Sequence, residues 1–179
     1  MKAYESRFTA LDLNEVNDVL LSGDLGFGAN VTKLEDSFPS FSMKNHNIAT
    51  NSASASAFMI FAFLKEKYGV CDVYTTSLGF VSPAWKQGQN KVVLMPVLYG
   101  GVSKIKDWQP LGDEIVVVDS AHCVTPSIKC DFSFFSFHPY KPLCSSDGGM
   151  ISTDDTEAAE YFRRYRNFGR TPLKEGYDI

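Results

Sequence analysis

Two uninterrupted apolar runs constrain the fold of this chain more than any other feature of its sequence. Residues 91–97 read KVVLMPV and residues 114–119 read EIVVVD. A strand that lacks polar alternation must be buried on both of its faces, as in a parallel sheet that helices cover. The two runs therefore predict two central strands of an α/β fold.

Shorter segments around these runs complete an alternation of helices and strands. We predict helices ending near residue 22 and over 31–38, 52–67, 82–87 and 155–168, and further strands over 46–50, 72–76, 131–137 and 148–152. This order indicates a mostly parallel sheet flanked by helices. Because the chain has 179 residues, 44% of them hydrophobic, we expect one globular domain over residues 1–179.

Composition disfavours several classes of partner. The net charge of −4 leaves no surplus of cations for a phosphate backbone, so we expect no nucleic-acid partner. No run of about 18 apolar residues and no secretory leader occurs, so we expect a cytoplasmic protein without a membrane partner. The cysteines form no C-x-x-C pair and have no histidine at metal spacing, so we predict reduced thiols and no metal site; they are Cys71, Cys123, Cys130 and Cys144.

Ligands of parallel sheets bind just beyond the carboxyl ends of the strands. Three segments that directly follow predicted strands carry polar or ionisable residues that could bind a ligand. The first is residues 51–56 (NSASAS), between a strand and the N-terminus of an apolar helix. Free main-chain N–H groups, the helix dipole and hydroxyl groups can form a phosphate cradle there. A helix N-cap with close packing explains the same residues equally well.

The second and third places hold an acid and an amine. Asp119 ends the triple-valine strand, where it is either a structural cap or a charge aimed at a cation or a protonated heterocycle. Lys141 follows the strand at 131–137 and has Tyr140, Pro142 and Leu143 as neighbours. An apolar setting lowers the pKa of an amine and makes it nucleophilic, whereas a lone loop lysine is ordinarily solvated. Together the three places fit a pyridoxal phosphate (PLP) site, with a phosphate cradle, an acid for the pyridinium nitrogen and a lysine for the Schiff base.

An ordered set of motifs resembles one enzyme family over about residues 20–176. The motifs are SGDLGFGANVTKLEDSF, NSASASA, DSAH at 119–122, SFHPYK at 136–141, SDGG at 146–149 and RYRNFG at 164–169. They are similar to those of the DegT/DnrJ/StrS group of fold-type-I PLP enzymes, the nucleotide-sugar aminotransferases. The resemblance implies the large, cofactor-binding domain of that fold.

The resemblance also implies roles for single residues. Lys141 would form the internal aldimine and later move the proton, while Asp119 would keep the pyridine nitrogen protonated. His122 matches the position that contacts the cofactor ring near its 3-hydroxyl group.

The phosphate group and the ring face have their own matches. Ser136, Ser54 and the main chain of Ala53 would bind the phosphate. Phe80 matches the aromatic residue that stacks on the pyridine ring, although an ordinary core phenylalanine remains the alternative.

The chain also departs from the family pattern. Members are about twice as long and carry a C-terminal small domain, which is missing here. A strand and a helix of the family pattern are bypassed at residues 88–90, and Ala53-Ser54 and Asp147 replace Gly-Thr and Glu of two motifs. We therefore expect either a shortened member or the leading part of a longer product, homodimeric and weakly active as it stands.

The implied function is transfer of an amino group from glutamate to a ketosugar carried by a nucleotide. One alternative is another fold-type-I PLP enzyme; the dehydratases of this family are disfavoured because they have histidine where this chain has Lys141. The other alternative is a non-catalytic remnant that binds PLP or a protein.

Overall fold

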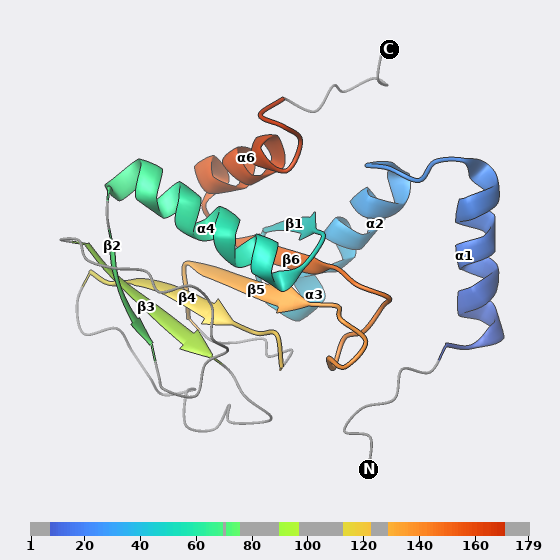
Figure 1. Cartoon of the computed structure of the whole chain (residues 1–179), viewed down its shortest axis with the longest axis horizontal. Helices are drawn as coiled ribbons and strands as arrows, with labels where there is room; N and C mark the ends of the chain where they lie inside the picture. Colours follow the sequence, from blue (N-terminus) through green and yellow to red (C-terminus); the bar gives the residue numbers. More distant parts are fainter. Residues whose placement is uncertain (1–7, 70, 76–89, 97–112, 123–128, 171–179) are drawn as a thin grey trace.

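The computed structural model describes residues 8–69, 71–75, 90–96, 113–122 and 129–170 (Figure 1). The helices are α1 (Ala10–Ser22), α2 (Ala29–Ser37), α3 (Pro39–Ser42), α4 (Ala53–Tyr68) and α6 (Thr156–Tyr165). The strands are β1 (His46–Thr50), β2 (Cys71–Thr75), β3 (Asn90–Pro96), β4 (Ile115–Asp119), β5 (Phe132–Ser136) and β6 (Gly149–Thr153). The helix predicted at 82–87 and Phe80 lie outside the described residues.

The six described strands form one sheet in the order β1-β6-β5-β4-β3-β2. Pairs β2–β3, β3–β4 and β4–β5 are parallel, which confirms the mostly parallel sheet. β6 runs antiparallel to both of its neighbours, β5 and β1. An antiparallel neighbour needs no helical crossover, and the sequence between β5 and β6 indeed predicted none.

β2 and β3 are direct neighbours, with Val73 opposite Val92. The strand and helix whose loss the motif pattern predicts would fall between β2 and β3 in the sequence. Since residues 76–89 lie outside the described residues, that loss stays a prediction.

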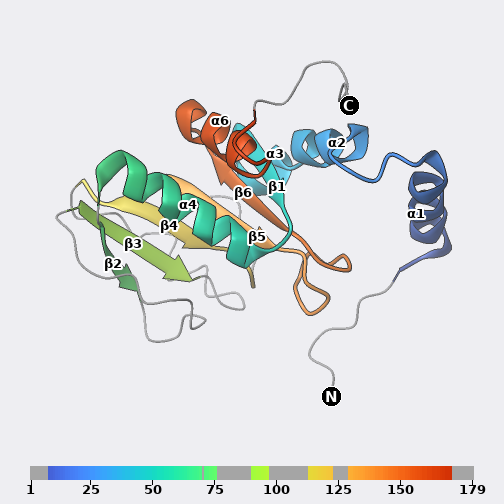
Figure 2. The ribbon, with the colours of Figure 1, turned by 45° about the horizontal axis from the view of Figure 1, so that its top comes forward.

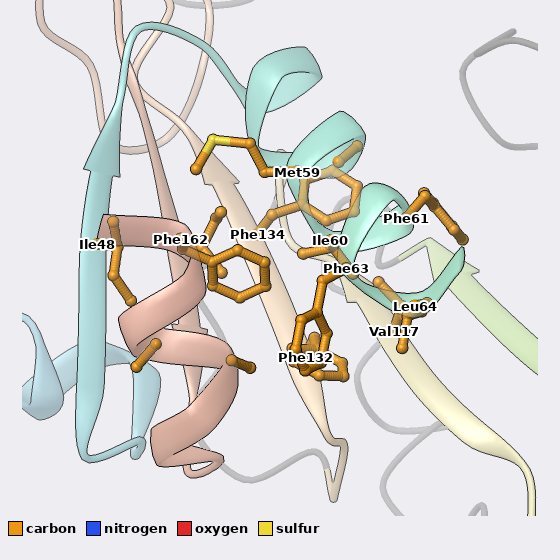
Figure 3. Packing of buried hydrophobic residues seen from close by; sticks show 14 of the residues in the cluster. Ile48, Met59, Ile60, Phe61, Phe63, Leu64, Val117, Phe132, Phe134 and Phe162 are labelled. Carbon is orange, nitrogen blue, oxygen red and sulfur yellow. The ribbon is translucent and has the colours of Figure 1, made fainter. Parts of the chain in front are cut away.

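The larger part of the core lies between the sheet and helices α4 and α6, which cover one face (Figures 1 and 3). α4 contributes a continuous apolar surface, and its Ile60 and Leu64 are almost fully buried. Three aromatic rings from α4, β5 and α6 meet edge to face, with centroids 5.6 to 6.1 Å apart; they are Phe63, Phe132 and Phe162. Burial of these rings fixes the C-terminal half of α4 and helix α6 on the sheet near the start of β5.

A smaller cluster covers the opposite face of the sheet. Because side chains alternate along a strand, Phe134 joins the α4 cluster while Phe135 faces the other way and packs on Phe38 and Met150. Phe38 lies between α2 and α3, and Pro39 begins α3, so the predicted end of the preceding helix is confirmed.

Of the two outermost helices, α1 ends at Ser22 as predicted, whereas α6 ends earlier than predicted. α6 ends at Tyr165, three residues before the predicted end, because Phe168 and Gly169 adopt positive φ angles of 57° and 78°. α1 stands apart from the sheet and buries none of its residues among the described parts of the chain (Figure 2).

Candidate functional site

The N-terminus of α4 is capped by a side chain and also presents main-chain N–H groups that could bind an anion. The Ser52 hydroxyl accepts the Ala55 N–H at 3.2 Å and so caps the helix. The hydroxyl groups of Thr50 and Ser56 lie 2.7 Å apart and fix the preceding turn. Ala53 and Ser54 open α4, and the N–H groups of a first helical turn have no partner within their own helix. The predicted cap and the capacity to bind an anion are therefore compatible.

Two glycines dock this helix terminus onto β6. A Cβ atom on Gly149 would lie 2.5 Å from the carbonyl carbon of Ser52 and 2.7 Å from the nitrogen of Ala53, so only glycine fits. Gly148 has φ +129°, a conformation that other residues rarely adopt. The SDGG motif thus has a steric reason, since it lets the helix approach the strand.

Ser136 lies on the other side of Gly149. The two residues are register partners in the β5–β6 ladder, and Ser136 is 8% exposed. Its Oγ accepts the N–H of His138 at 3.3 Å, and in the described part of the chain nothing accepts its own O–H hydrogen. Ser136 and the first turn of α4 therefore offer donors on opposite sides of one glycine.

Asp119 ends β4 at the same edge of the sheet, opposite Phe134 in the β4–β5 register. Its Oδ1 accepts the N–H of Ala121 at 2.9 Å, so the predicted structural cap is present. Burial raises the pKa of Asp119, and the Ala121 hydrogen bond and the positive charges of His122 and Lys141 oppose that effect. A half-buried carboxylate of this kind is stabilised further by any cation placed against it.

The amine of Lys141 meets the imidazole of His122. The Nζ and Nε2 atoms are 2.7 Å apart, so one of them donates and the other accepts, and the two groups cannot both be fully protonated. Burial lowers the pKa of Lys141 and, with the lysine charge, the pKa of His122, while the Asp119 charge raises both. The lowered pKa of Lys141 agrees with the sequence-based expectation.

The source of that lowered pKa differs from the expected one. Tyr140 is 66% exposed and Pro142 is also exposed, so only Leu143 among the three apolar neighbours packs inward. The half-burial of the amine arises beside His122 and Asp119, not from its neighbours in the chain.

The predicted site residues thus fall into two adjoining groups. Lys141, Asp119 and His122 form the first, and Ser136, Ser54 and Ala53 lie around Gly149 and form the second. The β4–β5 and β5–β6 registers place the groups side by side. Phe80 lies outside the described residues, so its stacking role stays a prediction.

Sequence reasoning gave no role to a buried ion pair near this site. The Glu35 carboxylate binds the Arg166 guanidinium and accepts the N–H of Ala49 at 2.8 Å, and Arg166 donates to the carbonyl of Ala49 at 2.9 Å. Both charged residues fall inside the quoted motifs. A long-range pair is invisible in one sequence, so those motifs were the only signal.

Two classes of site find no support in the described segments. No helix there has the length and apolarity that crossing a bilayer requires. In the same segments no three His, Cys, Asp or Glu side chains gather as a metal site would need.

Comparison with known proteins gives matches over almost the whole chain. The sequence profile of the DegT/DnrJ/EryC1/StrS aminotransferase family matches residues 7–86 and 87–177. The spore coat polysaccharide biosynthesis protein SpsC of Bacillus subtilis (strain 168) is 29% identical over 192 residues, which cover 85% of this chain and 49% of SpsC. A UDP-4-amino-4-deoxy-L-arabinose–oxoglutarate aminotransferase of Shewanella sediminis (strain HAW-EB3) is 26% identical over 196 residues, which cover 88% and 50%.

The fold is shared with solved structures. Helicobacter pylori PseC, an aminotransferase involved in the biosynthesis of pseudoaminic acid, superposes with a TM-score of 0.76 at 20% identity, over 98% of this chain and 58% of PseC. The chain spans about half the length of the curated relatives it matches.

Proposed function

Because the chain belongs to the DegT/DnrJ/EryC1/StrS aminotransferase family, we propose that it supplies the PLP-binding half of a nucleotide-sugar aminotransferase. The observation that carries this proposal is the half-buried amine of Lys141, 2.7 Å from His122 and within the field of Asp119. Fold and family alone would not identify the lysine, whereas a desolvated amine beside an acid has the chemistry that PLP needs.

The residues present fit this cofactor. PLP, when bound, supplies an aldehyde for amine exchange and a protonated ring that withdraws electrons. Asp119, whose pKa burial raises, gains stability from a cationic ring nitrogen. The N–H groups of Ala53 and Ser54 and the hydroxyl of Ser136 are donors for the phosphate.

Lys141 and His122 would manage protons in the reaction. Since burial lowers the pKa of Lys141, its Nζ loses a proton more readily than a surface amine does, and the neutral amine is the form that would hold an aldehyde cofactor. With its pKa lowered in this way, Nζ would also be suited to take up a proton from one carbon centre and return it to another. His122 would orient Nζ and contact the cofactor ring near its 3-hydroxyl group.

The substrate class rests on the relatives. The Shewanella sediminis protein is named for a UDP-sugar and for oxoglutarate, whose amino counterpart is glutamate. We therefore propose glutamate as amino donor and a nucleotide-linked ketosugar as acceptor. Groups that grip the sugar nucleotide would come in part from outside the present half-length chain.

We further propose that the protein is a cytoplasmic homodimer. The side chains of α1 and the following turn support an association, because Leu11, Val16, Leu20 and Leu25 are each more than half exposed. An isologous contact is the usual way to cover such a surface. Light scattering would show a dimer, whereas a stable monomer would contradict this assembly.

Trapping with borohydride tests the site directly. The protein is incubated with PLP, reduced and mapped by peptide mass spectrometry, and the pyridoxyl group is expected on Lys141. Lys141→Met should remove the label, and Lys67→Met, which removes an ion-paired surface lysine, should not. A label on another lysine of the native protein would overturn the assignment.

Turnover distinguishes an enzyme from a remnant that only binds PLP. Addition of glutamate should convert the visible absorbance band of the bound cofactor. Retention of the band with excess glutamate would favour the non-catalytic alternative.

A further inference from the structure

β1 is an edge strand, and its outer side near the phosphate cradle is closed by side chains. Ala49 lies opposite Met150 of β6, and its N–H and C=O are bonded to Glu35 of α2 and to Arg166 just after α6. In an antiparallel ladder every second residue turns both main-chain groups away from its partner strand. Among the described strands none lies on this side of β1, and Glu35 and Arg166 bond to Ala49 where such a strand would.

We propose that Glu35 and Arg166 are positioning residues that fix the end of β1 and thereby aim the first turn of α4 at the cofactor phosphate. This inference rests on the proposed PLP function. Residues 35 and 166 lie in two of the family motifs, but neither belongs to the residues that would contact the cofactor. The inference gives these two motifs a structural role.

The connection from the ion pair to the cradle is short and well bonded. Thr50 follows Ala49, and its Oγ1 lies 3.0 Å from the carbonyl oxygen of Ser52 and 2.7 Å from the Oγ of Ser56. Ser52 is the N-cap, and the N–H of Ala53 comes next. A displacement of Ala49 is therefore passed to the donors of the cradle over four residues.

The Glu35–Arg166 pair is shielded from water, and a further contact with Phe27 holds the arginine in place. The side chains of Glu35 and Arg166 are 12% and 13% exposed, so each charge depends on the other. The Arg166 guanidinium also lies 4.6 Å from the ring centroid of Phe27, a cation–π contact with the turn before α2. Removing Glu35 would leave a nearly buried cation and an unbonded main-chain N–H of Ala49.

The opposite end of β1 offers a matched control. There the carboxylate of Asp154 accepts the N–H of Asn45 at 2.9 Å and pairs with the Lys44 amine at 2.8 Å. Asp154 thus holds the start of the same strand through the same kinds of contact, remote from α4's N-terminus. Its removal loosens β1 without touching the cradle.

The experiment compares PLP with pyridoxal, which lacks the phosphate. Affinities of both are measured by absorbance titration for the native protein, Glu35→Ala, Glu35→Gln and Asp154→Ala. We expect Glu35→Ala to lower the PLP-to-pyridoxal affinity ratio about tenfold, the loss of roughly one hydrogen bond to a charged group. Asp154→Ala should keep the native ratio. Glu35→Gln, which keeps an acceptor for Ala49, should have a smaller effect and serves if Glu35→Ala does not fold.

The outcomes separate this inference from the function on which it rests. An unchanged ratio in the Glu35 variants, or an equal loss in Asp154→Ala, would overturn the positioning role. A native protein that shows no preference for PLP over pyridoxal would instead overturn the phosphate cradle, and with it the proposed function.

Discussion

A single methyl group on Gly149 should disturb the site in a measurable way. The Cβ atom of Gly149→Ala would lie 2.5 Å from the carbonyl carbon of Ser52, whereas carbon atoms pack at about 3.5 Å or more. Because the obstructing atoms belong to the main chain, the first turn of α4 must move away from β6 by about 1 Å. Overpacking of this kind costs about 1–3 kcal/mol, which corresponds to a fall in Tm of roughly 2–12 °C for a chain of this size.

The same movement displaces the proposed phosphate donors, so PLP affinity should fall about tenfold or more. Thermal unfolding followed by circular dichroism and PLP titration measure the two effects. Gly26→Ala is the control, since its Cβ would meet no atom within 4 Å. If Gly149→Ala unfolds at the native temperature and binds PLP with native affinity, the steric argument and the cradle built on it are wrong.

Three further predictions concern single groups. Asp119→Asn should still bind PLP but should slow the half-reaction with glutamate by about a hundredfold or more in stopped-flow absorbance, because the charge that stabilises the pyridinium is lost; a native rate would leave Asp119 as a strand cap only. Reductive methylation of the cofactor-free protein should reach its half-maximal rate at lower pH for Lys141, whose pKa burial lowers, than for Lys67, whose pKa a hydrogen bond to a glutamate raises; coincident pH profiles would contradict the desolvated amine. Iodoacetamide at mildly alkaline pH should alkylate the exposed Cys144 well before Cys130, because burial raises the pKa of Cys130 to about 11, and equal rates are expected only after unfolding.

Local sequence patterns predicted where the helices and strands lie better than they predicted how these pair and pack. The strand at 46–50 and the helix after Ser52 were predictable because periodicity and capping are local properties. The end of α6 was not, since the positive φ of Phe168 opposes its propensity. The short, helix-free connection from β5 is compatible with the antiparallel direction of β6, but the pairing of β6 with β1 depends on which strands become neighbours in the assembled sheet.

The candidate site likewise has features that local sequence predicts and features that depend on long-range contacts. Position after a strand was enough to single out Lys141 and Asp119 as candidates, because parallel strands bring their carboxyl ends together. The Glu35–Arg166 pair joins residues 131 apart in sequence, and the steric need for Gly149 depends on a helix about a hundred residues earlier. Contacts of that range follow from the assembled sheet and could not be read from either segment alone.

The pairing of β1 with β6 has a consequence for synthesis of the chain on the ribosome. His46 is opposite Thr153, so the partner of β1 is made about a hundred residues later. At about 5–20 residues per second, β1 and the apolar α4 wait roughly 5–20 s before β6 can cover them. During that interval Ile60 and Leu64 have no complete sheet on which to pack, and we expect nascent chains arrested before residue 149 to recruit holdase chaperones. The strand that carries Gly149 of the proposed phosphate cradle is thus also the one that ends the interval in which β1 and α4 are exposed to aggregation.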